Sequence, residues 1–323
     1  MSKRRNSKNN KKNKNKILAG ILALCMILAL IIFGASTETI NAFSNAVGLN
    51  IALENDTDTT NNQTNYVPTE NDLKVYFIDV GQADSILVTN KQEYMLIDAG
   101  NNDDGNDVVS FLKNKGISKI DYLIGTHPHE DHIGGLDDVI NNFEIKNIYM
   151  PKIETTTKTF KDVLSAISNK KLKVTAPKKG DKFDIGEARC EVMTDSILNK
   201  DNLNLSSIVI RLEFGNNSFL FMGDAETENE KTITWPKTDV LKVGHHGSNT
   251  STSKNFLNEV SPTYGIIMAG EGNTYGLPKE KILQRLAQAN VKIYRTDENG
   301  TVEMSSNGNE ISIVTEKTLD SLQ

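Results

Sequence analysis

Apolar and polar positions alternate in a regular way over most of the chain, and their period distinguishes strands from helices. Short β-branched and apolar runs such as LKVYFIDV, SILVTN and KIDYLIGTH are typical of buried strands. Between such runs, VVSFLKNKG, FKDVLSAISNKK and KEKILQRLAQAN carry apolar residues at helical spacing. The last pattern, TVEMSSNGNEISIVTE, predicts a closing hairpin. We therefore expect one α/β domain over residues 73–316, followed by a short tail at 317–323.

The first 72 residues follow a different pattern. Residues 1–16 hold eight Lys or Arg and no acidic residue, and residues 17–33 are almost entirely apolar. This apolar segment is at the lower limit for a transmembrane helix, and its basic flank would stay in the cytoplasm. Because Gly34-Ala35-Ser36 resembles a cleavage site, a signal peptide and secretion are the alternative to an uncleaved anchor. Residues 34–72 are rich in Asn and Thr, which predicts a flexible linker and an extracellular domain after it.

Charge and cysteine content narrow the function classes. Residues 17–323 carry 28 basic and 42 acidic residues, a net charge of −14. Such an acidic body binds nucleic acid poorly unless a local basic patch or bound metals offset it. Cys25 lies in the apolar run, so no disulfide framework is available to the rest of the chain. We expect the other cysteine, Cys190, to be a small buried hydrophobe rather than a ligand.

The five histidines carry most of the chemical information. Three of them fall in the motif His127-Pro-His129-Glu-Asp131-His132, directly after a predicted strand, and the other two are adjacent. In an extended segment, residues i and i+2 face the same side, so His127 and His129 can share one metal ion. The turn that follows can bring Asp131 and His132 toward a neighbouring ion. Imidazole and carboxylate ligands suit zinc, iron or manganese, whereas a set of solvated surface histidines is the alternative.

This motif, followed by Gly134-Gly135, resembles the signature of the metallo-β-lactamase superfamily. The resemblance continues through FIDVGQADS at 77–85, LIDAG at 96–100, FMGD at 221–224 and LKVGHHGS at 241–248. Together these segments are most similar to the hydrolase domain of the ComEC family of competence proteins. The resemblance implies a four-layer αββα sandwich with a two-metal site at one edge of the paired sheets, preceded here by the transmembrane or signal segment.

The resemblance also implies the ligands of both metal ions. His127 and His129 would hold the first ion, Asp131 and His132 the second, and Asp224 would bridge them. His245 would complete the second site, since it comes first after its strand, and His246 would then face the substrate, although the reverse assignment stays open. Asp98 would orient the histidine loop from behind.

One departure from the family pattern concerns the first ion. Many members of the superfamily supply another histidine to it, but no histidine lies between His132 and His245. A segment that contains Asn204 stands in that interval. We therefore expect a weaker or more open first site, with water or an Asn oxygen as ligand. Zinc is the default for both ions, and manganese is the alternative because it suits oxygen-rich coordination.

Two such ions can hold a bridging hydroxide as the nucleophile, with Asp131 assisting proton transfer. His246, Lys242 and Ser248 are candidates for contacting a phosphate or protonating the leaving oxygen. Alternatively, Lys242 is a solvated charge at the end of a strand, and Ser248 caps the segment that follows it. Three residues of the first turn are expected near the metals as substrate or supporting contacts, with a turn-forming role as the alternative: Asp79, Gln82 and Asp84.

The sequence thus predicts an extracytoplasmic two-metal hydrolase, held at the membrane by its N-terminal helix or else secreted. The ComEC-like resemblance favours a phosphodiesterase that acts on DNA or RNA, whereas the acidic body opposes a nucleic-acid substrate. A phosphodiesterase for a cell-envelope head group, similar to the phosphorylcholine esterases, is one alternative. A non-catalytic binding module is another, and β-lactam hydrolysis has only fold analogy in its favour.

Overall fold

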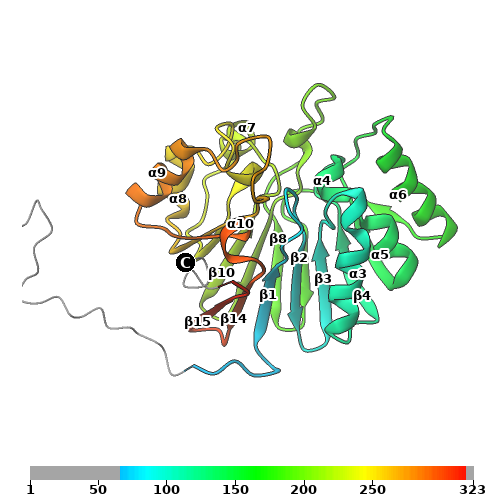
Figure 1. Cartoon of the computed structure of the whole chain (residues 1–323), viewed down its shortest axis with the longest axis horizontal. Coiled ribbons are helices and arrows are strands. Elements are labelled where there is room, and N and C mark those ends of the chain that lie inside the picture. The colour runs from blue at the N-terminus through cyan, green and yellow to red at the C-terminus, as the bar shows by residue number, and fades with distance from the viewer. Residues whose placement is uncertain (1–65, 318–323) are drawn as a thin grey trace, which may run out of the picture. The chain divides into compact units, whose positions relative to one another are not determined.

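The computed structural model describes residues 66–317 (Figure 1). The predicted basic segment 1–16, the transmembrane or signal segment 17–33, most of the linker and the end of the tail lie outside the described residues. Within residues 66–317, no helix combines the length and the apolar character that a membrane span requires.

The described chain builds two sheets of eight and seven strands. The first has the order β15-β14-β1-β2-β3-β4-β5-β6, and the second has the order β13-β12-β11-β10-β9-β8-β7. In the first sheet the strands are β1 (Leu73–Phe77), β2 (Ile86–Asn90), β3 (Glu93–Ile97), β4 (Lys119–Ile124), β5 (Glu144–Tyr149), β6 (Val174–Thr175), β14 (Val302–Ser306) and β15 (Ile311–Thr315). In the second they are β7 (Lys182–Ile185), β8 (Ala188–Val192), β9 (Ile210–Phe214), β10 (Asn217–Phe221), β11 (Val240–Lys242), β12 (Tyr264–Ile267) and β13 (Lys292–Arg295).

Each sheet begins with antiparallel strands and continues with parallel ones. β1, β2 and β3 form a meander, and β4, β5 and β6 then follow β3 in parallel. In the second sheet, β7 to β10 are antiparallel, and β11, β12 and β13 follow β10 in parallel. The predicted closing hairpin is β14–β15, which returns to pair with β1.

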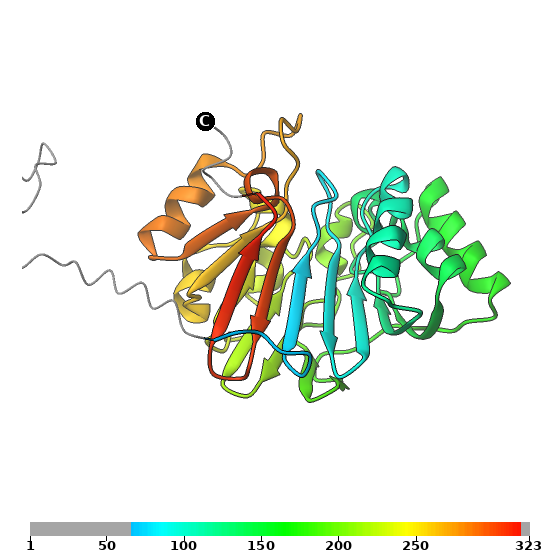
Figure 2. The same cartoon turned by 60° about the horizontal axis from the view of Figure 1, so that its bottom comes forward.

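Helices cover the outer face of each sheet, which gives four layers (Figures 1 and 2). The main helices on the first sheet are α3 (Gly105–Asn114), α5 (Leu136–Asn142) and α6 (Lys158–Asn169), and those on the second are α8 (Lys254–Val260) and α9 (Glu280–Gln288). Shorter helical segments are η1 (Asn102–Asp104), α4 (Glu130–Ile133), η2 (Leu203–Ser206), α7 (Thr227–Glu230), η3 (Gly244–Gly247) and α10 (Thr296–Asn299). The predicted α/β fold with paired sheets is confirmed.

The core between the sheets explains the continuous apolar runs of the sequence. Val75 and Phe77 face this core, where Phe77 lies 6.3 Å from Phe221 of β10 between ring centroids, and Tyr76 faces the helices instead. A strand that is covered on both faces needs apolar residues at successive positions. Cys190 is fully buried in the same core, as predicted.

The histidine motif is held by a close contact at the turn between α4 and α5. A Cβ on Gly134 would overlap the backbone of Asn101 and Asn102, and a Cβ on Gly135 would overlap the carbonyl of Ala99. Backbone cannot move aside as a flexible side chain can. The two glycines therefore let the loop after β3 pack directly on the helix that carries Asp131 and His132.

We predict that Gly134→Ala lowers the free energy of unfolding by about 2–3 kcal/mol, because overpacking against backbone forces the two loops apart. Gly125→Ala is the matched control, since its Cβ would meet only side chains, the nearest being Leu136 Cδ1 at 3.0 Å. That variant should lose no more than about 1 kcal/mol. Urea denaturation followed by circular dichroism measures both, and equal losses would contradict the assignment.

Candidate metal centre

The histidine motif changes its backbone conformation midway, and this places its side chains. β4 ends at Ile124, the chain bends at His127 and Pro128, and His129, with φ −82° and ψ 153°, is the residue before α4. Asp131 and His132 lie in the first turn of that helix. The bent segment before α4 therefore presents His127 and His129 together, and the helix presents Asp131 and His132 one step further along the site.

Asp224 lies between these two groups and directs one oxygen at each. Its Oδ1 is 3.2 Å from His132 Nε2 and 3.5 Å from His246 Nε2. Asp131 Oδ2 lies 3.3 Å from the same nitrogen of His246. These four residues offer ligand atoms that all lie within 4.8 Å of one another.

The other oxygen of Asp224 faces a second set of histidines. Its Oδ2 is 3.9 Å from His127 Nε2 and 3.7 Å from His245 Nε2. His129 Nδ1 lies 3.0 Å from His127 Nε2. The site thus consists of two clusters that share one buried carboxylate.

The structure reverses the expected roles of the adjacent histidines. His246, and not His245, joins Asp131, His132 and Asp224, while His245 lies beside the other oxygen of Asp224. Both residues have left-handed backbone, with φ 49° each, so they do not alternate as residues in a strand do. The Nδ1 of His246 lies 2.8 Å from the carbonyl of Met268, which fixes the ring and directs its Nε2 toward Asp131 and Asp224.

Three residues of the site pay a conformational cost. His245, His246 and Asp98 all have positive φ, between 49° and 59°. Left-handed backbone costs a non-glycine residue roughly 1 kcal/mol or more, and such strain is concentrated at functional sites. The packing around each loop must therefore hold these side chains in place.

Several polar atoms at the centre are buried without a partner. Among the described residues, His132 Nε2, Asp224 Oδ1 and His246 Nε2 are in this group. A buried polar atom without a hydrogen bond costs free energy, so three of them aimed at one space indicate a missing ligand. Two imidazole nitrogens with carboxylate oxygens are a donor set for a divalent metal ion. The residues present therefore fit a metal.

The charges of the cluster also favour a cation. Burial lowers the pKa of His246, but the carboxylates of Asp224 and Asp84 outweigh it and raise the pKa to about 10. Burial likewise opposes the charged form of His132, and Asp224 and Asp98 again raise its pKa well above the usual range. His127 behaves differently, because burial holds its pKa well below the usual range and leaves the imidazole neutral.

Lys242 is not at the cavity surface. It is fully buried and forms an ion pair with Asp84, and its Nζ donates to the carbonyl of Gly223 at 3.2 Å. The expected phosphate contact and the solvated-charge alternative are both wrong for this residue, since no solvent or substrate reaches it. Burial opposes ionisation of Asp84, but Lys242 and His246 hold its pKa below the usual value.

Asp84 connects the strand loops behind the metal cluster. Its carboxylate lies 3.4 Å from His246 Nδ1 and 3.8 Å from His132 Nδ1. Its backbone N–H donates to the carbonyl of Asp131, and its own carbonyl accepts from Gly100. Together with Lys242 it ties the loops after β1, β3, β4, β10 and β11 to one buried ion pair.

The remaining predicted residues fall into two groups. Asp98 lies behind His132, with 2.7 Å between its Oδ2 and His132 Nδ1, and accepts hydrogen bonds from Thr126. Asn204 Nδ2 is 3.4 Å from His245 Nδ1. Gln82 lines the cavity and accepts from the backbone of Gly270.

Asp79 and Ser248 do not join the metal cluster. Asp79 accepts from the backbone of Gly81, and Ser248 accepts from the backbone of Thr250, so each supports its own turn. Ser248 therefore supports a turn, and the helix that follows, α8, is capped by Ser253.

Sequence reasoning missed four residues that contact the ligands, among them Thr250, whose Oγ1 lies 2.9 Å from His245 Nδ1. Glu226 lies 3.3 Å from His245 Nδ1, and Ser207 Oγ accepts from the backbone of Asp224 at 3.2 Å. Thr126 Oγ1 is 3.1 Å from His127 Nδ1. Two of them could have been found from their position next to the candidate ligands in the sequence. Thr126 directly precedes the histidine motif, and Glu226 follows Asp224 by two positions.

The clusters open into a cavity of about 330 Å³. Its lining includes five of the candidate ligands and the exposed side chain of Tyr275. Of the two carboxylates that belong to the histidine clusters, Asp131 is the more accessible, with 32% of its side chain exposed, against 2% for Asp224.

We predict that Lys242→Met lowers the free energy of unfolding by about 3–5 kcal/mol, since it leaves Asp84 as an uncompensated buried charge. The double variant Asp84→Asn/Lys242→Met should lose at least about 1 kcal/mol less than the sum of the two single variants. Chemical denaturation of the four proteins measures this coupling, and additive losses would show that the two side chains act independently.

Comparison with known proteins gives a consistent picture. Residues 78–271 match the family described as the metallo-beta-lactamase superfamily. The chain is 32% identical over 252 residues to ComE operon protein 3 of Bacillus subtilis (strain 168), with 71% of this chain and 32% of that protein covered. It is 29% identical over 240 residues to competence protein ComA of Neisseria gonorrhoeae, with 72% of this chain and 32% of that protein covered.

Both curated relatives are longer, and the chain spans about a third of their length. Among solved structures, the metallo-beta-lactamase fold protein YhfI from Bacillus subtilis has a TM-score of 0.50 at 12% identity, with 72% of this chain and 99% of that chain covered. At that identity the likeness concerns the fold alone.

Proposed function

Since the chain belongs to the metallo-β-lactamase superfamily, we propose that it is a two-metal phosphodiesterase that hydrolyses DNA or RNA outside the cytoplasm. The observation that carries the proposal is the pair of clusters that share Asp224. The similarity to competence proteins supports nucleic acid as the substrate. The basic and apolar N-terminal segments of the sequence support the location.

Each proposed ion has four side chains to hold it. His127, His129, His245 and Asp224 Oδ2 would hold the first, and Asp131, His132, His246 and Asp224 Oδ1 would hold the second. His245 thus supplies the imidazole that the family pattern places elsewhere, so we no longer expect a weak first site. Three imidazoles around the first ion favour zinc over manganese, which prefers oxygen ligands.

When bound, two divalent ions would activate a water molecule and neutralise charge on a phosphoryl oxygen. Asp131 is the group that can accept the proton of the attacking water, because its carboxylate reaches the cavity while Asp224 is buried. Asp98 and Asp84 orient His132 and His246 from behind by facing their Nδ1 atoms. Lys242 neutralises Asp84 and has no direct part in the reaction.

Metal content tests whether His245 and His246 hold different metal ions. After incubation with zinc and exhaustive dialysis, the full chain should retain two ions, and His245→Ala and His246→Ala should each retain about one. Ser248→Ala is the control and should retain two, because Ser248 contacts only its own turn. Elemental analysis by mass spectrometry gives the ratios, and an unchanged ratio in His245→Ala would remove that residue from the ligand set.

Turnover tests the reaction itself. We predict that the zinc-loaded chain cleaves single-stranded DNA or RNA, and that Asp224→Ala lowers kcat at least about a thousandfold because both ions lose their shared ligand. Asp79→Ala should retain activity, since that side chain lies outside the metal cluster.

Three outcomes would contradict a nuclease. Hydrolysis of p-nitrophenyl phosphorylcholine without cleavage of nucleic acid would point to an envelope head group. Rapid hydrolysis of nitrocefin would point to a β-lactamase. A folded, metal-loaded chain without any turnover would point to a binding module.

A further inference from the structure

Positive charge is concentrated in one segment of this acidic chain. Residues 151–180 contain eight lysines, no arginine and two acidic residues, a net charge of +6. From residue 17 onward, the rest of the chain carries 20 basic and 40 acidic residues. All eight lysines are exposed. The segment includes α6, and its exposed lysines supply the local positive charge that binding to a polyanion requires.

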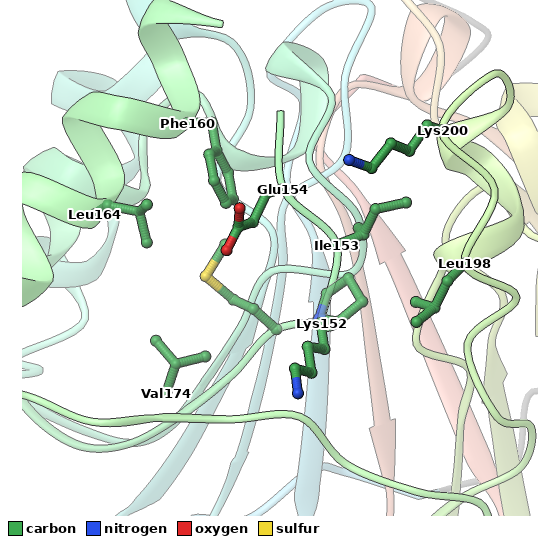
Figure 3. A pocket seen from close by; sticks show the side chains of 10 residues that line it. Lys152, Ile153, Glu154, Phe160, Leu164, Val174, Leu198 and Lys200 are labelled. Carbon is green, nitrogen blue, oxygen red and sulfur yellow. The ribbon is translucent and has the colours of Figure 1, made fainter. Parts of the chain in front are cut away.

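An apolar groove of about 410 Å³ lies at the start of this segment (Figure 3). Phe160, Leu164 and Val174 line one side, and Leu198 and Lys200 line the other. Leu164, Val174 and Leu198 are exposed by 41%, 41% and 57%. They are three of the six large apolar side chains that are exposed among residues 66–317. Such a concentration of exposed apolar surface indicates a binding site.

Two lysines give the groove a cationic rim. Lys152 and Lys200 both line it, and Glu154 is the acidic residue among the lining side chains. Within residues 66–317, the lysines that pair with carboxylates are others. The ammonium groups of Lys152 and Lys200 are therefore available to an anionic ligand.

Both walls of the groove are connected to the metal cluster through short stretches of chain and hydrogen bonds. Tyr149, which precedes the groove, accepts a hydrogen bond from Gly125, two residues before His127. Leu198 and Lys200 lie on the loop that continues to Asn204, which contacts His245. A third connection consists of two hydrogen bonds: Thr159 donates to Asn102, and Asn102 donates to Glu130, which lines the metal cavity.

We propose that this groove receives a nucleobase of single-stranded nucleic acid, with Lys152 and Lys200 on the adjoining phosphates and the strand continuing to the metal cluster. The inference rests on the proposed nuclease function and adds a site for the substrate. Single strands combine the two features that the groove matches, a repeated negative charge and an exposed flat apolar group. A poly(glycerol phosphate) carries the repeated negative charge but has no flat apolar group.

Binding without turnover provides the test. The full chain is titrated in EDTA against a labelled oligothymidylate and against an abasic phosphodiester oligomer of the same length, and anisotropy gives Kd. We expect the oligothymidylate to bind about tenfold more tightly, since contacts to a base are of that order. Equal affinity for the two oligomers, or for poly(glycerol phosphate), would overturn the proposal.

Variants locate the site. Leu164→Ser/Leu198→Ser should abolish the preference for bases and leave the abasic oligomer unaffected. Lys152→Gln/Lys200→Gln should weaken the binding of the oligothymidylate and of the abasic oligomer alike. It should also reduce the slope of log K against log salt concentration by about 0.7 for each lost phosphate contact. Val314→Ser, at a side chain 59% exposed, and Lys281→Gln, on exposed α9 surface, are the matched controls. Groove variants that bind like these controls would also overturn the proposal.

Hydrolysis is measured separately with zinc, so the two proposals fail in different ways. Base-dependent binding without cleavage would retain the groove and exclude the nuclease. Cleavage without base preference would retain the nuclease and exclude the groove.

Discussion

The carboxylate of Asp224 is the constraint around which this domain is arranged. Its two oxygens face opposite clusters of histidine nitrogens, so a displacement of this side chain would disturb both clusters at once. The loops that carry these groups come from the carboxyl ends of strands in both sheets, where ligand sites of α/β folds form. The buried Lys242–Asp84 pair holds the same loops from behind, through Gly223 on one side and through Asp131 and Gly100 on the other.

Much of the fold follows from the sequence, because its strands are apolar on both faces and its long helices have a clear period. The short elements were not predictable in the same way. The hairpin β7–β8 has polar residues at alternate positions, and α8 spans only Lys254–Val260. The ligand types of the site were also readable, since the histidine motif is compact. Their assignment was not, because His245 and His246 take left-handed backbone that no strand period describes.

Lys242 shows a further limit of reading one sequence. A lysine at the end of a strand is usually solvated, and only its partner Asp84, distant in the chain, explains why this one is buried. Net charge misleads in a similar way. The acidic total opposes a nucleic-acid substrate, but residues 151–180 carry a net charge of +6, and Lys152 of this segment lines the groove.

The central claim is that one carboxylate is shared by two metal ions, with His245 and His246 on different ions. Anomalous diffraction at the zinc edge, from crystals of the zinc-loaded chain, tests it most directly. We predict two peaks, one beside each oxygen of Asp224, with His245 on the first and His246 on the second. A single peak, or two peaks that both adjoin His246 while His245 contacts neither, would contradict it.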